Sequence, residues 1–103
     1  MNEERTAPAA AYCGRGVIVR EVGAISGDLE CTIERAGPDL ARVLITYRGA
    51  AEYYEAEGSP VHTRLPLSEV QDKVLTLLRS TAPQETPGNP SRLTLAEISW
   101  KDE

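Results

Sequence analysis

The sequence predicts an α+β fold: a two-layer domain with one main helix on a mostly antiparallel sheet of four to six strands. Residues 29–35 alternate between apolar and polar side chains, which is typical of a strand with one polar face. Residues 42–58 join a β-branched apolar run to a second strand-like run at Gly49. Only the stretch that begins at Ser68 has apolar residues at helical spacing. The expected order is β-β-β-β-(β)-α-β.

The chain of 103 residues has the usual length of a single domain. Its first residues, 1–11, are small and polar around Pro8 and cannot bury much apolar surface. We therefore expect a flexible N-terminal tail over 1–11 and one α+β domain over 12–103. With no Phe in the chain, Val, Leu and Ile must fill most of the core.

A hairpin is predicted near the start of the domain. Residues 16–25 are rich in β-formers, and residues 26–28, Ser-Gly-Asp, have the composition of a turn. The strand that follows places Leu29, Cys31 and Ile33 on one face. The two runs should therefore pair as antiparallel neighbours.

The third strand is expected over residues 41–48, with apolar side chains on both faces, which indicates a central position in the sheet. Gly49 permits a tight reversal into a fourth strand over residues 51–57. One long strand bent at a bulge is the alternative. Residues 61–65 lie between two prolines and fit a short edge strand.

The helix is predicted to begin at Ser68, which forms a capping box with Gln71. Pro83 should end it near Ser80 or Thr81. One face of the helix is apolar and comprises Val70, Val74, Leu75, Leu77 and Leu78.

Two segments follow the helix. Residues 82–91 contain three prolines and form a long loop, and residues 92–100 form a last strand that returns to the sheet.

Charge and hydropathy limit the partners of this chain. The net charge is −5 and the pI is about 4.9, which argues against binding of nucleic acid or an anionic membrane. No apolar run is long enough to span a membrane, and the N-terminus lacks the pattern of a secretory signal. A cytoplasmic location is therefore expected. With 16 acidic and 11 basic residues, the charge excess is too mild to favour mimicry of nucleic acid.

The residue types that usually carry catalysis or metal binding form no recognisable pattern. In the predicted hairpin Cys31 lies opposite Gly23, ten residues or roughly 33 Å of extended chain from Cys13, whereas a disulfide needs α-carbons about 5.5 Å apart. Two free thiols are expected, with Cys31 buried. The sole histidine, His62, falls on the edge segment, and no set has the spacing of metal ligands. We therefore expect no cofactor, no metal and no catalytic residues, and a non-enzymatic protein is favoured.

The segment from residue 52 to residue 57 is the best candidate for a binding site. Its strand alternation places one tyrosine in the core and the other among carboxylates at the surface, and leaves open which is which. Tyrosine is common in binding hot spots, and surrounding acid would steer a basic partner. The alternative is an ordinary amphipathic strand whose glutamates protect an edge from aggregation. The candidate partner-binding residues are Glu52, Tyr53, Tyr54, Glu55 and Glu57.

Two functions remain open. The favoured hypothesis is a small non-enzymatic protein-binding module, comparable in type to the inhibitors of phages and the immunity proteins of bacteria, that binds a basic protein partner. The alternative is a homo-oligomeric domain, such as a homodimer, that binds a small ligand or acts as an enzyme. Its pocket would lie between helix and sheet or between subunits, with His62 or a buried carboxylate as the acid-base group.

Overall fold

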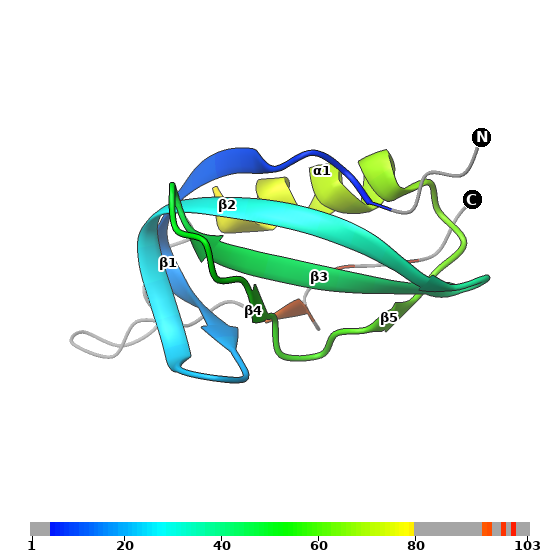
Figure 1. Ribbon diagram of the computed structural model, residues 1–103, viewed down its shortest axis with the longest axis horizontal. Helices are drawn as coiled ribbons and strands as arrows, with labels where there is room; N and C mark the ends of the chain where they lie inside the picture. The colour runs from blue at the N-terminus through cyan, green and yellow to red at the C-terminus, as the bar shows by residue number, and fades with distance from the viewer. Residues whose placement is uncertain (1–4, 80–93, 96–97, 99, 101–103) are drawn as a thin grey trace.

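The computed structural model describes residues 5–79, 94, 95, 98 and 100. The described strands form one antiparallel sheet in the order β1-β2-β3-β4, in which β5 also pairs with β3, and one helix covers one side of it (Figure 1). This confirms the predicted two-layer α+β fold. The elements are β1 (Ala9–Val19), β2 (Gly23–Gly37), β3 (Leu40–Tyr47), β4 (Tyr54–Glu55), β5 (Val61–His62) and α1 (Leu67–Leu78).

The β1–β2 hairpin is confirmed, but its predicted turn was wrong. The chain reverses at residues 20–22, and Val19 pairs with Gly23. Gly27, predicted to lie in the turn, is inside β2 opposite Cys13, where the register of the two strands shifts. Its φ of 107° is a conformation that glycine adopts without strain. The Ser-Gly-Asp composition therefore marks an irregularity within a long strand rather than the end of a short one.

Pairing begins earlier in the chain than the sequence predicts. Ala9 is the first residue of β1 and lies opposite Cys31. Before it, Arg5 forms a bridge to Glu34, and the Thr6 amide donates to the Ile33 carbonyl at 2.8 Å. The last residues of the segment predicted as a tail are thus part of the sheet.

The sheet curls so that the end of β1, at one edge, contacts the chain just after β4. After the register shift, Val19 forms a bridge with Ala56, which follows β4. Two backbone hydrogen bonds support this contact, from Arg20 N to Glu55 O at 2.9 Å and from Glu57 N to Ile18 O at 3.0 Å. β1 is therefore bonded to β2 along its length and to the chain beyond β4 at its end.

β3 occupies the central position that its two apolar faces predicted. It pairs with β2 on one side, and on the other side with both short strands, Ile45 opposite Tyr54 and Ala41 opposite Val61. The reversal at Gly49 is confirmed, with φ of 84°, so the alternative of one long bent strand is wrong. The predicted fourth strand, however, retains ladder pairing only over its two central residues.

Helix α1 begins at Leu67, and the predicted capping box was wrong. No side chain caps the helix, and Pro66 occupies the N-cap position, where its carbonyl accepts from the Glu69 and Val70 amides. Gln71 is drawn instead to the N-terminal segment, where its amide nitrogen lies 2.8 Å from the Ala7 carbonyl. The helix ends at Leu78, slightly before the expected position.

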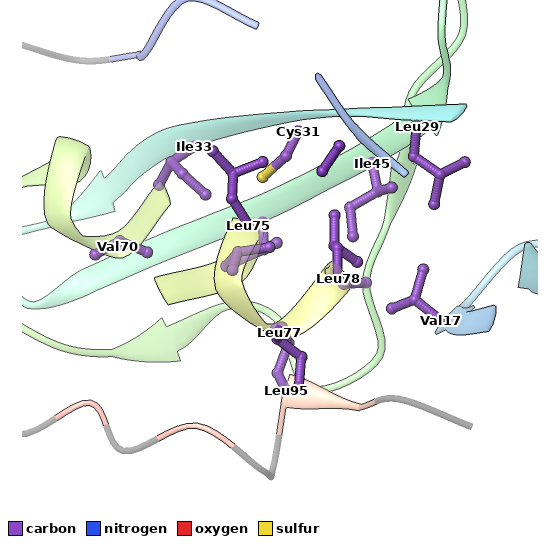
Figure 2. Packing of buried hydrophobic residues seen from close by; sticks show 14 of the residues in the cluster. Val17, Leu29, Cys31, Ile33, Ile45, Val70, Leu75, Leu77, Leu78 and Leu95 are labelled. Carbon is purple, nitrogen blue, oxygen red and sulfur yellow. The ribbon is translucent and has the colours of Figure 1, made fainter. Parts of the chain in front are cut away.

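The core lies between α1 and the inward face of the sheet (Figure 2). Leu29, Cys31 and Ile33 of β2 point toward the helix, as their alternation predicted, and are fully buried. Full burial of one such Leu or Ile contributes about 1.5–3 kcal/mol. The helix side chains that meet them are those of the predicted apolar face, Val70, Val74, Leu75, Leu77 and Leu78, all buried.

The predicted loop over residues 82–91 lies outside the described residues. Four residues of the predicted last strand are described, namely Thr94, Leu95, Ile98 and Trp100, and none of them is in a strand. Instead, the Ile98 amide donates to the Leu95 carbonyl, as in a turn, and Leu95 is buried in the core cluster that also contains Leu77. No helix within the described part of the chain is long and apolar enough to cross a membrane.

Candidate functional site on the open face of the sheet

The outward side of β2 and β3 is free of helical cover within the described residues. In Figure 1, α1 lies behind these strands, and their other side is turned toward the viewer. Strand alternation directs Glu30, Thr32 and Glu34 of β2 to this side, away from the core. We call it the open face. It also includes the residues of β1 and β3 that pair with these positions, Glu55 of β4, which pairs with Leu44, and Tyr53, whose hydroxyl reaches Glu30.

At one end of the open face, the acidic side chains are paired with arginines. Arg42 of β3 lies directly opposite Glu34, and its Nη1 is 2.8 Å from Glu34 Oε1. The same guanidinium reaches Glu55 with Nε at 3.5 Å, and Arg5 approaches Glu34 at 3.2 Å. Because these pairs are partly exposed, each contributes at most about 1 kcal/mol. Their main effect is to neutralise this end of the face.

Glu55, one of the predicted binding residues, has a structural role. Its carboxylate accepts a hydrogen bond from the Ser59 hydroxyl at 2.8 Å and is only 16% exposed. Its backbone amide donates to the Glu21 carboxylate at 3.1 Å, which joins the β1–β2 turn to β4. Glu55 is therefore poorly placed to contact a partner directly.

The two tyrosines have different environments, which answers the question that the alternation left open. Tyr54 lies opposite Ile45, whose side chain is in the core, and packs against the core cluster. Tyr53 belongs to the open face, where its hydroxyl donates to Glu30 Oε1 at 3.3 Å. Both rings are half-buried. Tyr53 is thus the tyrosine available to a partner.

The remaining predicted residues, Glu52 and Glu57, are exposed. The Glu52 carbonyl accepts a hydrogen bond from the Thr46 hydroxyl, which fixes the backbone next to Tyr53. The Glu57 amide is held by Ile18 of β1. The backbone of both residues is therefore held by hydrogen bonds, while their carboxylates remain in solvent.

Glu30 belongs to this surface and was missed as a site residue. The alternation of residues 29–35 does place it on the polar face of β2. Its proximity to Tyr53 depends on the pairing of β2 with β3 and of β3 with β4, because Glu30 lies opposite Thr46 and Ile45 lies opposite Tyr54. Local sequence carries no signal for such a register.

Both cysteines are free and Cys31 is buried, as predicted; Cys13 is buried too, and the positions of the two residues differ from those expected. Cys31 lies opposite Ala9 and Cys13 opposite Gly27, four pairs apart along the hairpin or roughly 13 Å. Burial raises the pKa of the Cys31 thiol to about 12, and burial also raises the pKa of Cys13. Neither thiol is therefore activated as a nucleophile.

His62 is a surface residue, as its place on the edge segment predicted. Its side chain is 81% exposed, and Nδ1 lies 4.0 Å from Asp39 Oδ2. Among the described residues no three His, Cys, Asp or Glu side chains come together as a potential metal site.

Comparison of the chain with protein-family profiles, with curated proteins and with solved structures finds no significant match. The structure itself defines the class: a small α+β domain in which one helix packs on a curled antiparallel sheet.

Proposed function

We propose that this protein is a small non-enzymatic protein-binding module of the inhibitor or immunity type, which binds a basic protein partner through the open face. The observation that carries the proposal is the contact between the Tyr53 hydroxyl and Glu30. It joins the acidic tyrosine segment, residues 52–57, to the Glu30 carboxylate of β2 on the side of the sheet that α1 leaves uncovered.

The chemistry of this surface suits recognition of a protein. A half-buried tyrosine offers a large, rigid contact area at a small loss of side-chain entropy. Glu30 lies beside it, and Glu52 and Glu57 are exposed in the same segment of the chain. Their negative charge would accelerate encounter with a positively charged partner. Binding should therefore weaken as the salt concentration rises.

The interior supports binding at the surface over binding between helix and sheet. The described side chains that face one another across the two layers are apolar and buried, including Ile45, Val74 and Leu78. A ligand pocket needs a few convergent polar groups among its apolar walls. The two free thiols also suit the reducing cytoplasm, where we place the protein.

The partner can be identified by affinity purification from the native host with mass spectrometry, followed by measurement of its Kd. Tyr53→Ala and the double variant Glu52→Lys/Glu57→Lys should each weaken binding at least tenfold, with the midpoint of urea unfolding nearly unchanged. Matched controls are Tyr47→Ala, an exposed tyrosine whose position alternates to the other side of β3, and Glu69→Lys on the helix.

Wild-type affinity in the open-face variants would reject the proposal, and the two controls are expected to bind as the wild type does. Tyr54→Ala is unsuitable as a test, because Tyr54 packs against the core and its loss would also destabilise the fold.

A further inference from the structure

We infer that the end of the open face around Glu30 is a subsite for an arginine side chain of the protein partner, whose guanidinium binds the Glu30 carboxylate and lies against Tyr53. This inference rests on the proposed function, because it specifies the group that the face would recognise. It follows from the distribution of charge along the face, from an unpaired hydroxyl beside Glu30, and from the aromatic ring that borders them.

Charge compensation along the open face is uneven. Glu34 and Glu55 both lie within ion-pair distance of Arg42. Glu30 has no such neighbour among the described cations, and its one recorded side-chain contact is the Tyr53 hydroxyl. An ionised carboxylate offers about four acceptor positions. The Glu30 carboxylate can therefore still accept two hydrogen bonds from a bidentate donor.

The hydroxyl of Thr32 gives an independent indication of a ligand. Thr32 follows Glu30 on the same face of β2 and is 3% exposed. Its Oγ1 has no hydrogen-bond partner among the described residues. Leaving such a group unsatisfied costs about 1–3 kcal/mol. Thr32 lies two positions from Glu30 on the same face of β2, so a donor bound to Glu30 would approach the side of the sheet that carries this oxygen. Because Oγ1 is buried, a hydrogen bond to it would also require the side chains that cover it to move.

Arginine fits these features better than lysine. Its planar guanidinium group carries five N–H donors. Two of its nitrogens can donate to one carboxylate while the third approaches a neighbouring acceptor. The plane also stacks on an aromatic ring, whereas the lysine ammonium is a strongly hydrated point charge. Tyr53 supplies the ring beside Glu30, and Tyr12, 66% exposed and opposite Asp28, supplies another at the rim.

The subsite can be tested on the full chain with hexa-arginine and hexalysine peptides as probes. We expect hexa-arginine to bind with a Kd at least tenfold lower than that of hexalysine, and to shift the amide resonances of Glu30, Thr32 and Tyr53. Glu30→Gln should remove this preference. Glu34→Gln, whose carboxylate is already paired with Arg42, should keep it.

Thr32→Val provides a readout that does not depend on the charge of Glu30. The substitution removes the unpaired hydroxyl while keeping nearly the same shape, so the protein should be as stable as the wild type or more stable. Its affinity for hexa-arginine should nevertheless fall about threefold, because one acceptor is lost. Equal affinity for the two peptides, or a preference that survives Glu30→Gln, would overturn the arginine subsite.

Measurements of binding to the natural partner distinguish this inference from the proposed function. Loss of partner binding in Tyr53→Ala but not in Glu30→Gln would overturn the arginine subsite and leave the binding face standing. Wild-type affinity in both variants would overturn both. Loss in both variants, together with the preference for hexa-arginine, is the result expected.

Discussion

The Ser59 hydroxyl accepts a hydrogen bond from the Val43 amide at 2.9 Å. It takes the place of the backbone carbonyl that a neighbouring strand would otherwise provide at this position. β4 ends at Glu55 and β5 begins at Val61, so the edge of β3 opposite Val43 lies between the two short strands. The Val43 carbonyl is satisfied by the Ala56 amide at 2.9 Å. The same hydroxyl donates to Glu55, and one fully buried serine thus completes the edge of the central strand.

Replacement of Ser59 by Ala should therefore destabilise the domain. The substitution leaves the buried Val43 amide without an acceptor and removes a donor from Glu55, so we expect the free energy of unfolding to fall by about 1–3 kcal/mol. Urea denaturation measures this loss. The matched control is Ser68→Ala: Ser68 is exposed on the helix and caps nothing, so the change should stay within about 0.5 kcal/mol. Equal losses at both serines would contradict the assignment.

Gln71 attaches the helix to the N-terminal segment and should be sensitive to loss of its amide group. Its Nε2 lies 2.8 Å from the Ala7 carbonyl, 2.9 Å from the Cys31 carbonyl and 3.0 Å from Thr6 Oγ1. Gln71→Glu keeps the shape but replaces the donor by an acceptor, so the free energy of unfolding should fall by about 1–3 kcal/mol.

Hydrogen exchange gives this prediction a local readout. The Thr6 amide, bonded to Ile33 O at 2.8 Å, should exchange faster in Gln71→Glu, because the segment that carries it is no longer held by the helix. Asp72→Asn on the exposed side of α1 is the control and should leave this exchange rate unchanged. Unaltered protection of Thr6 in Gln71→Glu would show that Gln71 does not hold the segment.

Arg35 secures the connection between β5 and α1. Its Nη2 donates to the Leu65 carbonyl at 2.8 Å, and its Nη1 lies 3.2 Å from the Thr63 carbonyl. Arg35→Met keeps much of the side-chain length but removes these charge-assisted bonds, so a loss of about 1.5–3 kcal/mol is expected in urea denaturation. Arg64→Met, at an exposed position in the same connection, should change stability by less than about 0.5 kcal/mol. A small effect at Arg35 would mean that water replaces the guanidinium.

The predictable part of the fold is the part encoded by local periodicity. The burial of Leu29, Cys31 and Ile33 follows from alternation, and the helix face around Val74 follows from the 3.6-residue period, because both patterns are properties of neighbouring residues. The position of the first turn could not be predicted, since Gly27 has the same composition signal in a tight turn and in an irregular strand.

The sequence was sufficient to predict which segment of the chain contains the candidate site. It was not sufficient to predict which side chains of that segment, and of other strands, lie together on one surface. Residues 52–57 stand out by composition, yet their division between core and surface depends on the pairing of Ile45 with Tyr54. The contribution of Glu30 depends on a second register, between β2 and β3. Gln71 was assigned to a local cap because its long-range partners, such as Ala7, lie more than sixty residues away in sequence. Such contacts are set by tertiary packing rather than by propensity.

Burial of Cys31 should make the stability of the domain fall at alkaline pH. The thiol has an ordinary pKa of 9.0, and burial raises its pKa to about 12 in the folded protein. Below pH 9 the thiol is protonated in both states and its contribution to stability is fully present. Above pH 9 the unfolded chain ionises while the folded chain does not, so this contribution is lost progressively as the pH rises toward 12.

The effect is isolated by comparing the wild type with Cys31→Ala in urea denaturation between pH 8 and 10.5. All other groups are the same in the two proteins, so the difference between the two curves reports Cys31. Above pH 9 the wild type should lose about 1.4 kcal/mol per pH unit relative to the variant. Parallel curves would mean that the Cys31 thiol ionises as readily in the folded protein as in the unfolded chain. Its reaction with a thiol reagent at pH 9 would then be fast under native conditions, whereas a raised pKa requires it to be slow.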